Sequence, residues 1–283
     1  MDHQHQHADH HHHGHGNDAV LAELLDLDAE VLQSYLVEVS TWAHGLAPEA
    51  TRVVDLGAGT GTGTMALAGL FTSAEIFAVD QSAAMLTRVR AKAEQYGFGD
   101  RVRTVEADVQ SGWPELGPVD LIWASLSLHE MAEPERVFAL LLDALAPGGL
   151  LVVIEMDAPP RFLPTDLGLG RPGFEERCHR VLEASRSGFE PHPDWGPRLV
   201  QAGLDLIQTR SFDVAPAGAT PPSTGRYARG YLRQIGASLS ERLAPDDVVV
   251  LETLIADSGP HSLLERDDLS VRGRRTAWVA RRP

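Results

Sequence analysis

An acidic residue and a run of alternating glycines stand at the end of the first strongly apolar segment of the chain. Residues 52–56 are mostly β-branched or apolar, which predicts a buried strand that carries Asp55 near its end. The alternate glycines over 57–63 can adopt backbone angles closed to other residues, which predicts a tight turn. Residues 62–71 then predict a helix with threonines placed to cap it. A ligand can bind directly against such a loop, because the first N–H groups of a helix have no intrahelical partner.

The spacing of these glycines separates the loop from two well-known phosphate-binding motifs. A dinucleotide fingerprint has the pattern G-x-G-x-x-G, but the sixth position counted from Gly57 is Thr62. A P-loop needs a lysine after its glycines, and the single lysine of the chain is Lys92. The pattern Asp-x-Gly-x-Gly-x-Gly therefore predicts a nucleotide-like ligand without ATP hydrolysis. A glycine-rich turn that binds nothing is the alternative.

Two more acids follow the next two predicted strands. Asp80 comes after a strand over 75–79, about 21 residues beyond Gly59, where a carboxylate can accept hydrogen bonds from both hydroxyls of a ribose. Its alternative role is to cap the helix predicted over 82–96. Asp108 follows a strand over 102–106 and can accept a hydrogen bond from the amino group of a base.

The order of elements predicts how these residues meet. Strands over 120–124 and 150–156 flank a helix over 134–145, so five strands alternate with helices and predict an α/β fold with a doubly wound, parallel sheet. The carboxyl ends of parallel strands meet at one edge of the sheet, where ligands bind. His129 and Glu130 follow the fourth strand and belong to the same edge.

The rest of the chain has weaker patterns. Two amphipathic helical segments are predicted before the first strand, over 20–25 and from an N-cap at Asp28 to residue 46. After residue 157 we expect a loop over 157–172, helices over 173–187, 195–202, 225–240 and 244–257, a strand over 205–214 and a last strand over 269–280.

These motifs together resemble the class I S-adenosylmethionine-dependent methyltransferases, over roughly residues 30–157 and again in the last two strands. The matching pieces are Val-Val-Asp-Leu-Gly-Ala-Gly-Thr-Gly at 53–61, Ala-Val-Asp at 78–80, Ala-Asp-Val at 107–109, the strand and loop at 119–131 and Pro-Gly-Gly at 147–149. The resemblance implies a Rossmann-like sheet of seven strands, the last one antiparallel, with helical lid insertions. It also implies S-adenosylmethionine as the cofactor.

By this resemblance, the glycines pass close to the methionine part, Asp80 holds the ribose, and Asp108 with Val109 contacts the adenine. The backbone at Ala124 and Ser125 would face the methionyl ammonium. The cofactor-binding residues that the resemblance implies are Asp55, Gly57, Ala58, Gly59, Gly61, Asp80, Gln81, Asp108, Val109, Ala124 and Ser125.

Methyl transfer from a sulfonium needs alignment of the acceptor in a dry site, and at most one proton acceptor. His129 is the candidate base, because it follows the fourth strand and an imidazole titrates near neutral pH. Glu130 is the second candidate. A structural role for His129, bracing the loop or lining the pocket, is the alternative. Cys178 and His179 are neighbours on a predicted helix and point apart, which leaves no thiol dyad.

Composition limits the partners. The 283-residue chain has a formal net charge of −16, which argues against nucleic acid or an anionic membrane as partners. No apolar run is long enough for a membrane span, no secretory signal is present, and one cysteine suits a reducing cytoplasm. We therefore expect a small organic methyl acceptor, by family analogy a natural product or other secondary metabolite. A homodimer is left open.

Domain boundaries follow from the same patterns. Residues 1–17 hold eight histidines and almost nothing apolar, which predicts a disordered tail that binds metal loosely or is merely solvated. Residues 18–283 are expected to form one methyltransferase domain. Its parts are N-terminal helices over 18–50, a cofactor-binding core over 51–157, and helical lid or substrate segments over 158–203 and 215–267.

Two other functional classes share some of these features. An NAD(P)-dependent oxidoreductase would have the same sheet and use Asp80, but its glycine spacing differs and Asp108 would have no clear role. A non-catalytic protein that binds a cofactor or a metal would keep the pocket or the histidines without an open acceptor cavity.

Overall fold

The computed structural model describes residues 12–185, 193–216 and 218–283. Seven strands form one sheet in the order β3-β2-β1-β4-β5-β7-β6. Their bounds are β1 Arg52–Leu56, β2 Glu75–Asp80, β3 Val102–Glu106, β4 Val119–Ser125, β5 Leu145–Met156, β6 Asp205–Asp213 and β7 Arg274–Arg281. The pairs among β1 to β5 are parallel, and β7 lies antiparallel between β5 and β6. The sheet expected from the sequence is confirmed, including its antiparallel last strand.

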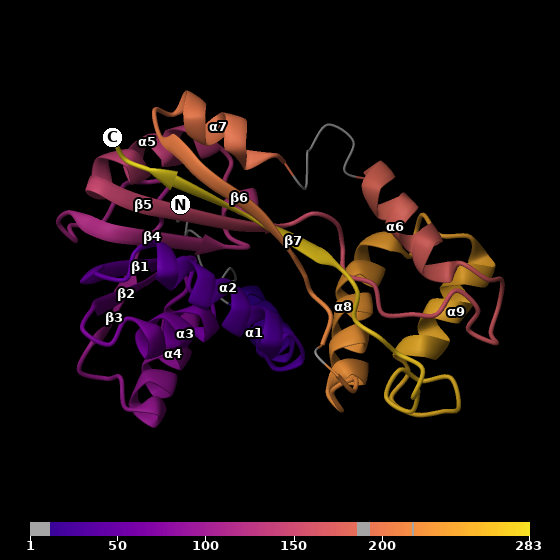
Figure 1. Cartoon of the computed structure of the whole chain (residues 1–283). Coiled ribbons are helices and arrows are strands. Elements are labelled where there is room, and N and C mark those ends of the chain that lie inside the picture. The colour runs from indigo at the N-terminus through magenta and orange to yellow at the C-terminus, as the bar shows by residue number, and fades with distance from the viewer. Residues whose placement is uncertain (1–11, 186–192, 217) are drawn as a thin grey trace, which may run out of the picture.

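Helices cover both faces of this sheet and form a separate lobe beyond its strand ends (Figure 1). Their bounds are α1 His12–Val31, α2 Gln33–Leu46, α3 Thr62–Leu70, α4 Ala83–Tyr96, the 3-10 turn η1 Leu128–Glu130, α5 Pro134–Ala144, α6 Phe174–Ser185, α7 Trp195–Gln201, α8 Thr224–Leu239 and α9 Pro245–Ile255. The lobe holds α6, α8 and α9, and α8 lies against α1 (Figure 1). Of the helices in the segments predicted as a lid, α6, α8 and α9 lie in this lobe, whereas α7 packs with α5 on the sheet (Figure 1).

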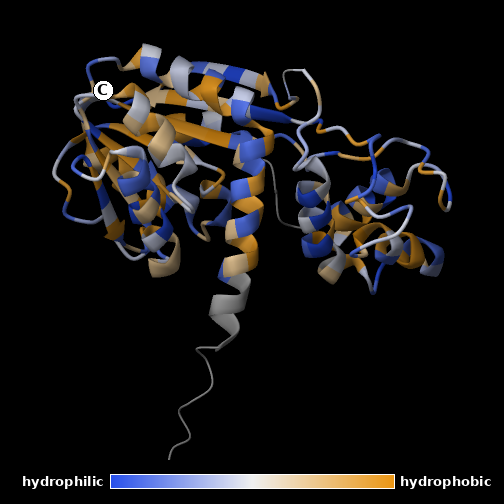
Figure 2. Cartoon of the chain, turned by 90° about the horizontal axis from the view of Figure 1, so that it is seen from below, coloured by the Kyte–Doolittle hydropathy of each residue, from blue (hydrophilic) through white to orange (hydrophobic). Residues whose placement is uncertain are grey.

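Strand residues alternate between two hydrophobic cores, as the two-residue repeat of a strand requires. Val53 and Trp123 face the core under α2 and α3, which continues into the helical lobe. Val54 and Ile122 face the other core, under α5 and α7. Figure 2 shows the hydrophobic colour concentrated in the strands at the centre of the sheet. Burial on both faces explains why the central strands read as continuous apolar runs.

The N-terminal helices differ from the prediction. Residues 1–11 of the histidine-rich segment lie outside the described residues, and α1 already begins at His12. It runs to Val31, and α2 begins at Gln33 without a side-chain cap. The prediction of Asp28 as an N-cap is wrong: Asp28 lies within α1 and accepts hydrogen bonds from the side chains of Tyr227 and Arg275.

Two strands have ends that the sequence did not indicate. β5 begins at Leu145, five residues before the expected start, because Leu145 pairs with Val119 ahead of the Pro-Gly-Gly segment. β7 begins at Arg274 instead of residue 269, because the preceding buried residues make only an isolated bridge between Arg272 and Arg161. In the described part of the chain, none of the helices combines the length and the apolarity that a membrane span requires.

Candidate active site

A cavity of about 640 Å³ lies at the carboxyl ends of β1, β2, β4 and β5. Helices α1, α2 and α8 contribute the opposite wall. The cavity has two parts, which we name by their residues. The nucleoside half is lined by the loops after β1, β2 and β3. The acceptor half is lined by Tyr35, His129, Met156, Tyr227 and Arg275.

The glycine loop after β1 has the strained backbone that its composition predicts. Gly57, Gly59 and Gly61 have φ values of +71°, +51° and +85°, in the left-handed region that favours glycine. A Cβ atom at Gly61 would lie 3.2 Å from the Cα of Val89. The loop is also bound to the next strand, because the N–H groups of Gly57 and Ala58 both donate to the carbonyl of Val79. No other residue type fits this turn without strain.

Asp80 is positioned for hydroxyl groups of a ligand. Its Oδ2 accepts from the Gly59 N–H at 2.8 Å, and its Oδ1 accepts from the Ser82 N–H at 2.8 Å. A carboxylate has about four lone-pair positions, so two remain for a ribose. Ser82, not Asp80, caps α4, since the Ser82 Oγ accepts from the Met85 N–H. The capping alternative for Asp80 is therefore wrong.

Asp55 is the acid that closes the inner end of the nucleoside half. It is buried, and its carboxylate accepts from the Thr64 hydroxyl at 2.6 Å. Burial, opposed by that hydrogen bond, raises its pKa to about 6. The indole N–H of Trp123 has no hydrogen-bond partner, and a Cβ atom at Gly63 would lie 3.1 Å from Asp55 and 3.2 Å from Trp123. Sequence analysis missed Trp123, although an aromatic residue at the end of an apolar strand was a visible signal.

These features fit S-adenosylmethionine. The cradle above Gly63 stays open only because that residue has no side chain. Asp55 offers a carboxylate to an ammonium group, and the unpartnered Trp123 N–H offers a donor to a carboxylate. Asp108 stands at the outer end, where its oxygens accept from the Gln110 N–H and the Ser111 hydroxyl, both at 2.9 Å.

Most of the predicted cofactor residues meet at this cavity. Its lining includes Asp55, Gly57, Ala58, Gly59, Asp80, Gln81, Asp108, Val109 and Ser125. Gly61 and Ala124 are not part of the lining. Gly61 instead starts α3 as its N-cap residue, and the side chain of Ala124 is buried in the core under α5. Their predicted contacts with the cofactor stay predictions.

His129 is held between two carboxylates. It lies in η1, directly after β4, with its Nδ1 2.8 Å from the Glu155 Oε2 and its Nε2 3.2 Å from the Glu130 Oε1. The other oxygen of Glu155 accepts from the backbone N–H groups of Leu128 and His129. Glu155 is buried near the end of β5, so it fixes both the ring and the turn that carries it.

These neighbours change the chemistry expected of His129. Burial alone would lower the pKa of His129, but the hydrogen bonds and charges of Glu130 and Glu155 outweigh burial and raise the pKa to about 10. These two carboxylates favour the protonated ring at neutral pH, whereas the sequence-based expectation was a ring that titrates there. Sequence analysis also missed Glu155, whose signal was a single acid within an otherwise apolar strand.

The wall of the acceptor half comes from distant parts of the chain. Arg275 at the start of β7 donates through Nη2 to the Asp28 Oδ1 at 2.6 Å, and the Tyr227 hydroxyl of α8 donates to the same oxygen at 2.6 Å. The guanidinium also lies 4.9 Å from the ring centroid of Tyr35 in α2. One carboxylate thus joins α1, α8 and β7 across the cavity. No motif in the sequence indicated this cluster.

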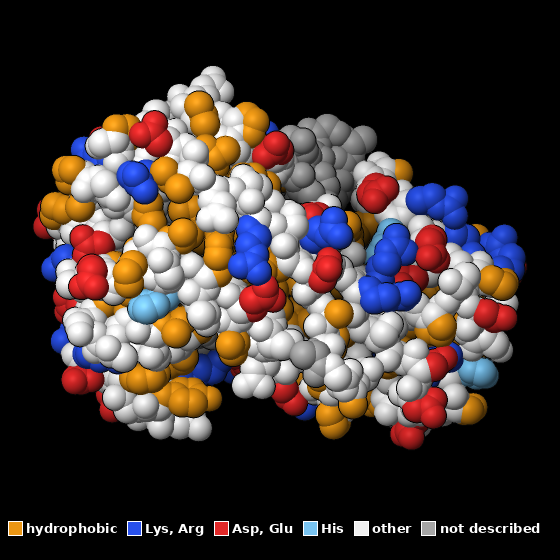
Figure 3. Space-filling model, viewed as in Figure 1, with side chains coloured by type: hydrophobic (Ala, Val, Ile, Leu, Met, Phe, Trp, Pro, Cys, Tyr) orange, Lys and Arg blue, Asp and Glu red, His pale blue; other side chains and the backbone are white. Residues whose placement is uncertain are grey.

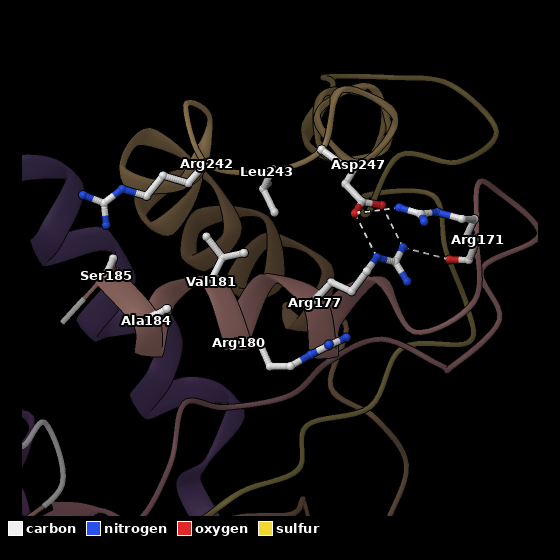
Figure 4. Close-up of a pocket in the computed structure, with 10 residues that line it drawn as sticks. Arg171, Arg177, Arg180, Val181, Ala184, Ser185, Arg242, Leu243 and Asp247 are labelled. Atoms are coloured by element: carbon white, nitrogen blue, oxygen red, sulfur yellow. Dashed lines mark hydrogen bonds and ion pairs between the residues drawn. The ribbon is translucent and has the colours of Figure 1, made fainter. Parts of the chain in front are cut away.

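A second cavity, of about 480 Å³, lies in the helical lobe away from the strand ends. Figure 4 shows Arg177 of α6 paired with Asp247 of α9, where Nε lies 2.8 Å from Oδ2 and Nη2 lies 2.7 Å from Oδ1. Basic side chains gather over this lobe on the face in Figure 3. Burial raises the pKa of the nearby Cys178 thiol to about 12, so this cysteine is no nucleophile at neutral pH. The Arg177–Asp247 pair joins two helices.

Comparison with known proteins agrees with the sheet and the cavity. The family model of the methyltransferase domain matches residues 53–149. Trans-aconitate 2-methyltransferase of Variovorax paradoxus (strain S110) is 38% identical over 137 residues, which are 48% of this chain and 45% of the relative. The enzyme of the same name from Deinococcus radiodurans is 39% identical over 150 residues, 52% of this chain and 49% of the relative. The chain spans about half the length of these curated relatives.

The fold is also found among solved structures. A protein from Bacillus halodurans C-125 that is assigned to the methyltransferases has a TM-score of 0.55 to this chain at 17% identity, over 87% of this chain and 98% of that protein. This likeness concerns the fold alone. The domain match covers the glycine loop, Asp80, Asp108 and His129. Residues 53–149 of this chain therefore match a methyltransferase domain, and the sheet that carries them has the fold of a methyltransferase.

Proposed function

We propose that the protein transfers the methyl group of S-adenosylmethionine to a carboxylate oxygen of a small organic acid. The observation that carries this proposal is the placement of His129 between the carboxylates of Glu155 and Glu130, which favours the protonated ring. A ring with a pKa of about 10 cannot take a proton from an alcohol or a phenol at neutral pH. A carboxylate needs no such step, because it is already ionised at neutral pH.

The nucleoside half positions the cofactor, which supplies an electrophilic methyl group on a sulfonium. Asp80 binds the ribose hydroxyls with its two remaining lone-pair positions, and hydrogen bonds to a charged group contribute about 1.5–3 kcal/mol each. Asp108 accepts from the adenine amino group, and the buried Val109 contacts the base. Asp55 and the backbone at Ser125 face the methionyl ammonium.

His129 orients the acceptor in this scheme. Its imidazolium attracts a carboxylate, and Glu155 keeps the ring fixed through Nδ1. The Glu130 side chain is 78% exposed, so an acceptor carboxylate that replaces it at the His129 Nε2 costs little buried structure. Positioning of the carboxylate in line with the methyl group is the main contribution that a site of this kind makes to the rate.

The acid is small because the cavity must hold the cofactor as well, and helices α1 and α8 form the wall opposite the strand ends. The two relatives described above are named for trans-aconitate, which is a carboxylic acid. Their names support a carboxylic acid as the methyl acceptor of this chain. That the acid belongs to secondary metabolism, and that neither nucleic acid nor a membrane is a partner, rests on family analogy and on the net charge of −16. The location in the cytoplasm and a homodimer are parts of the same proposal.

Two measurements test the function in order. Thermal unfolding with S-adenosylhomocysteine at about one hundred times its dissociation constant should add about 2.7 kcal/mol of stability, whereas NADH should add none. Methyl transfer from labelled S-adenosylmethionine is then measured with trans-aconitate and other small acids, and with their fully esterified forms as controls. Product from an acid but not from its ester supports the proposal. Transfer to an alcohol or phenol but to no acid contradicts it.

A further inference from the structure

Two buried hydrogen-bond donors in the acceptor half have no partner. Neither the Tyr35 O–H nor the Arg275 Nε–H has an acceptor within the described part of the chain, although their residues are only 4% and 5% exposed. The Tyr35 oxygen lies beside the Arg275 side chain, whose hydrogen bond opposes the rise in the Tyr35 pKa that burial causes. Both residues line the cavity. Buried polar groups in native proteins are almost always hydrogen-bonded, so a ligand is expected to supply the partner.

Neither donor is free to turn away from the cavity. Arg275 is fixed by the bond from its Nη2 to Asp28 and by the Tyr35 ring below its guanidinium. The Tyr35 ring in turn lies edge-on to Phe212, with their centroids 6.1 Å apart. The two donors are thus held side by side before any ligand arrives, which removes the ordering cost from binding.

These donors and His129 line the same cavity from two sides of the sheet. Met156 ends β5 and its Cα pairs with that of Arg275, while the preceding residue, Glu155, holds His129. The charge of Glu155 also acts on the Tyr35 hydroxyl. Glu155 and Met156 are consecutive in β5 and point to opposite faces of the sheet, so His129 and the donor pair approach the cavity from its two sides.

The charges decide what kind of group binds there. Asp28 already balances the charge of Arg275, so the free Nε–H and the Tyr35 O–H offer two hydrogen bonds without a net positive charge. A carbonyl-type oxygen, from a carboxylate, an ester or an amide, accepts two such bonds. A hydrocarbon end would leave both donors unsatisfied.

We propose that the methyl acceptor carries a second oxygen group, a carboxylate or a carbonyl, which binds to the Tyr35 hydroxyl and the Arg275 Nε. This inference rests on the proposed function, in which His129 holds the carboxylate that is methylated. The acceptor is then a bifunctional acid, and the Tyr35–Arg275 donor pair selects it against simple monocarboxylates.

Three probes with the same four-carbon frame test this pair by titration calorimetry on the full chain with S-adenosylhomocysteine present. Crotonate has one carboxylate and a methyl end, monomethyl fumarate has a carboxylate and an ester carbonyl, and fumarate has two carboxylates. Fumarate, the ester or both should bind at least tenfold more tightly than crotonate. If fumarate and the monoester both bind more tightly than crotonate, a carbonyl oxygen is sufficient. If fumarate alone binds more tightly, a carboxylate is needed.

Tyr35→Phe is the variant that isolates the donor pair. It removes a buried hydroxyl whose proton has no acceptor in the part of the chain that the structure describes, so its melting temperature should stay close to that of the parent. It should bind all three probes with the affinity of crotonate. Tyr96→Phe removes an exposed tyrosine hydroxyl outside the cavity and should keep the tenfold preference.

Equal binding of the three probes by the parent protein overturns the inference, as does absence of binding by all of them. A preference that survives in Tyr35→Phe overturns it too. Since the readout is binding and not turnover, a preference that depends on Tyr35 without methyl transfer to any acid would reject the proposed function and keep the donor pair.

Discussion

The two halves of the cavity are built in different ways. The nucleoside half comes from residues 55–125, from loops that each follow a strand, and it depends on backbone conformation at the glycines. The acceptor half depends on side chains from α1, α2, α8, β5 and β7, which the fold brings together from residues 28 to 275. A cofactor site can thus be read from a short motif, whereas an acceptor site depends on contacts between distant segments.

The largest effect that would test this contrast is expected at Asp28. Asp28→Asn leaves the buried Arg275 without a balancing charge and weakens the bond of Tyr227, so we expect the free energy of unfolding to fall by about 3 kcal/mol. Urea denaturation measures this change. The control is Asp26→Asn, which removes a more exposed pair with Lys92 and should cost less than about 1 kcal/mol. Equal losses in both variants would show that the acceptor half does not depend on the Asp28 cluster.

A substitution in the nucleoside half should change the affinity for the cofactor product more than the stability of the fold. Asp80→Ala removes the acceptor for ribose hydroxyls, and we expect S-adenosylhomocysteine to bind about a hundredfold more weakly, a change of about 2.7 kcal/mol. Calorimetric titration gives the affinity, and Asp100→Ala is the matched exposed aspartate. Unchanged affinity in Asp80→Ala would place the ribose elsewhere.

Substitutions at two glycines with similar φ test whether the nucleoside half depends on backbone conformation. Gly61→Ala combines strain at +85° with a contact to the Val89 backbone, and we expect it to destabilise the fold by about 2 kcal/mol. Gly97→Ala has strain at +76° but no atom within 4 Å of its Cβ, so about 1 kcal/mol is expected. Thermal and urea unfolding measure both variants. A larger loss at Gly97 would mean that the close approach in the glycine loop is unimportant.

His129 gives the smallest effect and a pH dependence. In His129→Gln we expect turnover to fall about tenfold, or about 1.4 kcal/mol, with nearly unchanged affinity for S-adenosylhomocysteine. The pKa of His129 is raised in the folded state, so the stability that its charge adds is fully present below its ordinary value of 6.5. That stability declines as the pH rises and is lost above about 10.

Urea denaturation at pH 7 and pH 9.5 tests the charge separately from catalysis. The parent should lose stability between these values, and His129→Gln should lose less. The same loss in both proteins would mean that His129 is neutral at pH 7, and the argument for a carboxylate acceptor would fail with it.

Local patterns in the sequence were enough for the sheet. β1 and β3 have the predicted bounds, because an apolar run that ends at glycines or an acid leaves little freedom in where a buried strand stops. The sequence was less informative at Leu32, where α1 ends and α2 begins without a capping side chain. It also placed the start of β7 five residues too early, since buried residues before Arg274 look like strand but pair only through one bridge.

The sequence by itself determined which motif follows each strand, the class of cofactor that these motifs predict, and most of the residues that line the nucleoside half. These features depend on backbone angles and on spacing within a few residues. Only the tertiary structure decided that Glu155 keeps His129 charged and that Asp28 joins Tyr227 to Arg275. The protonation of a side chain depends on groups that surround it in space. Apart from the neighbouring Glu130, the partners concerned lie far away in the chain: 26 residues separate Glu155 from His129, and 247 residues separate Asp28 from Arg275. A motif within one segment cannot contain that information.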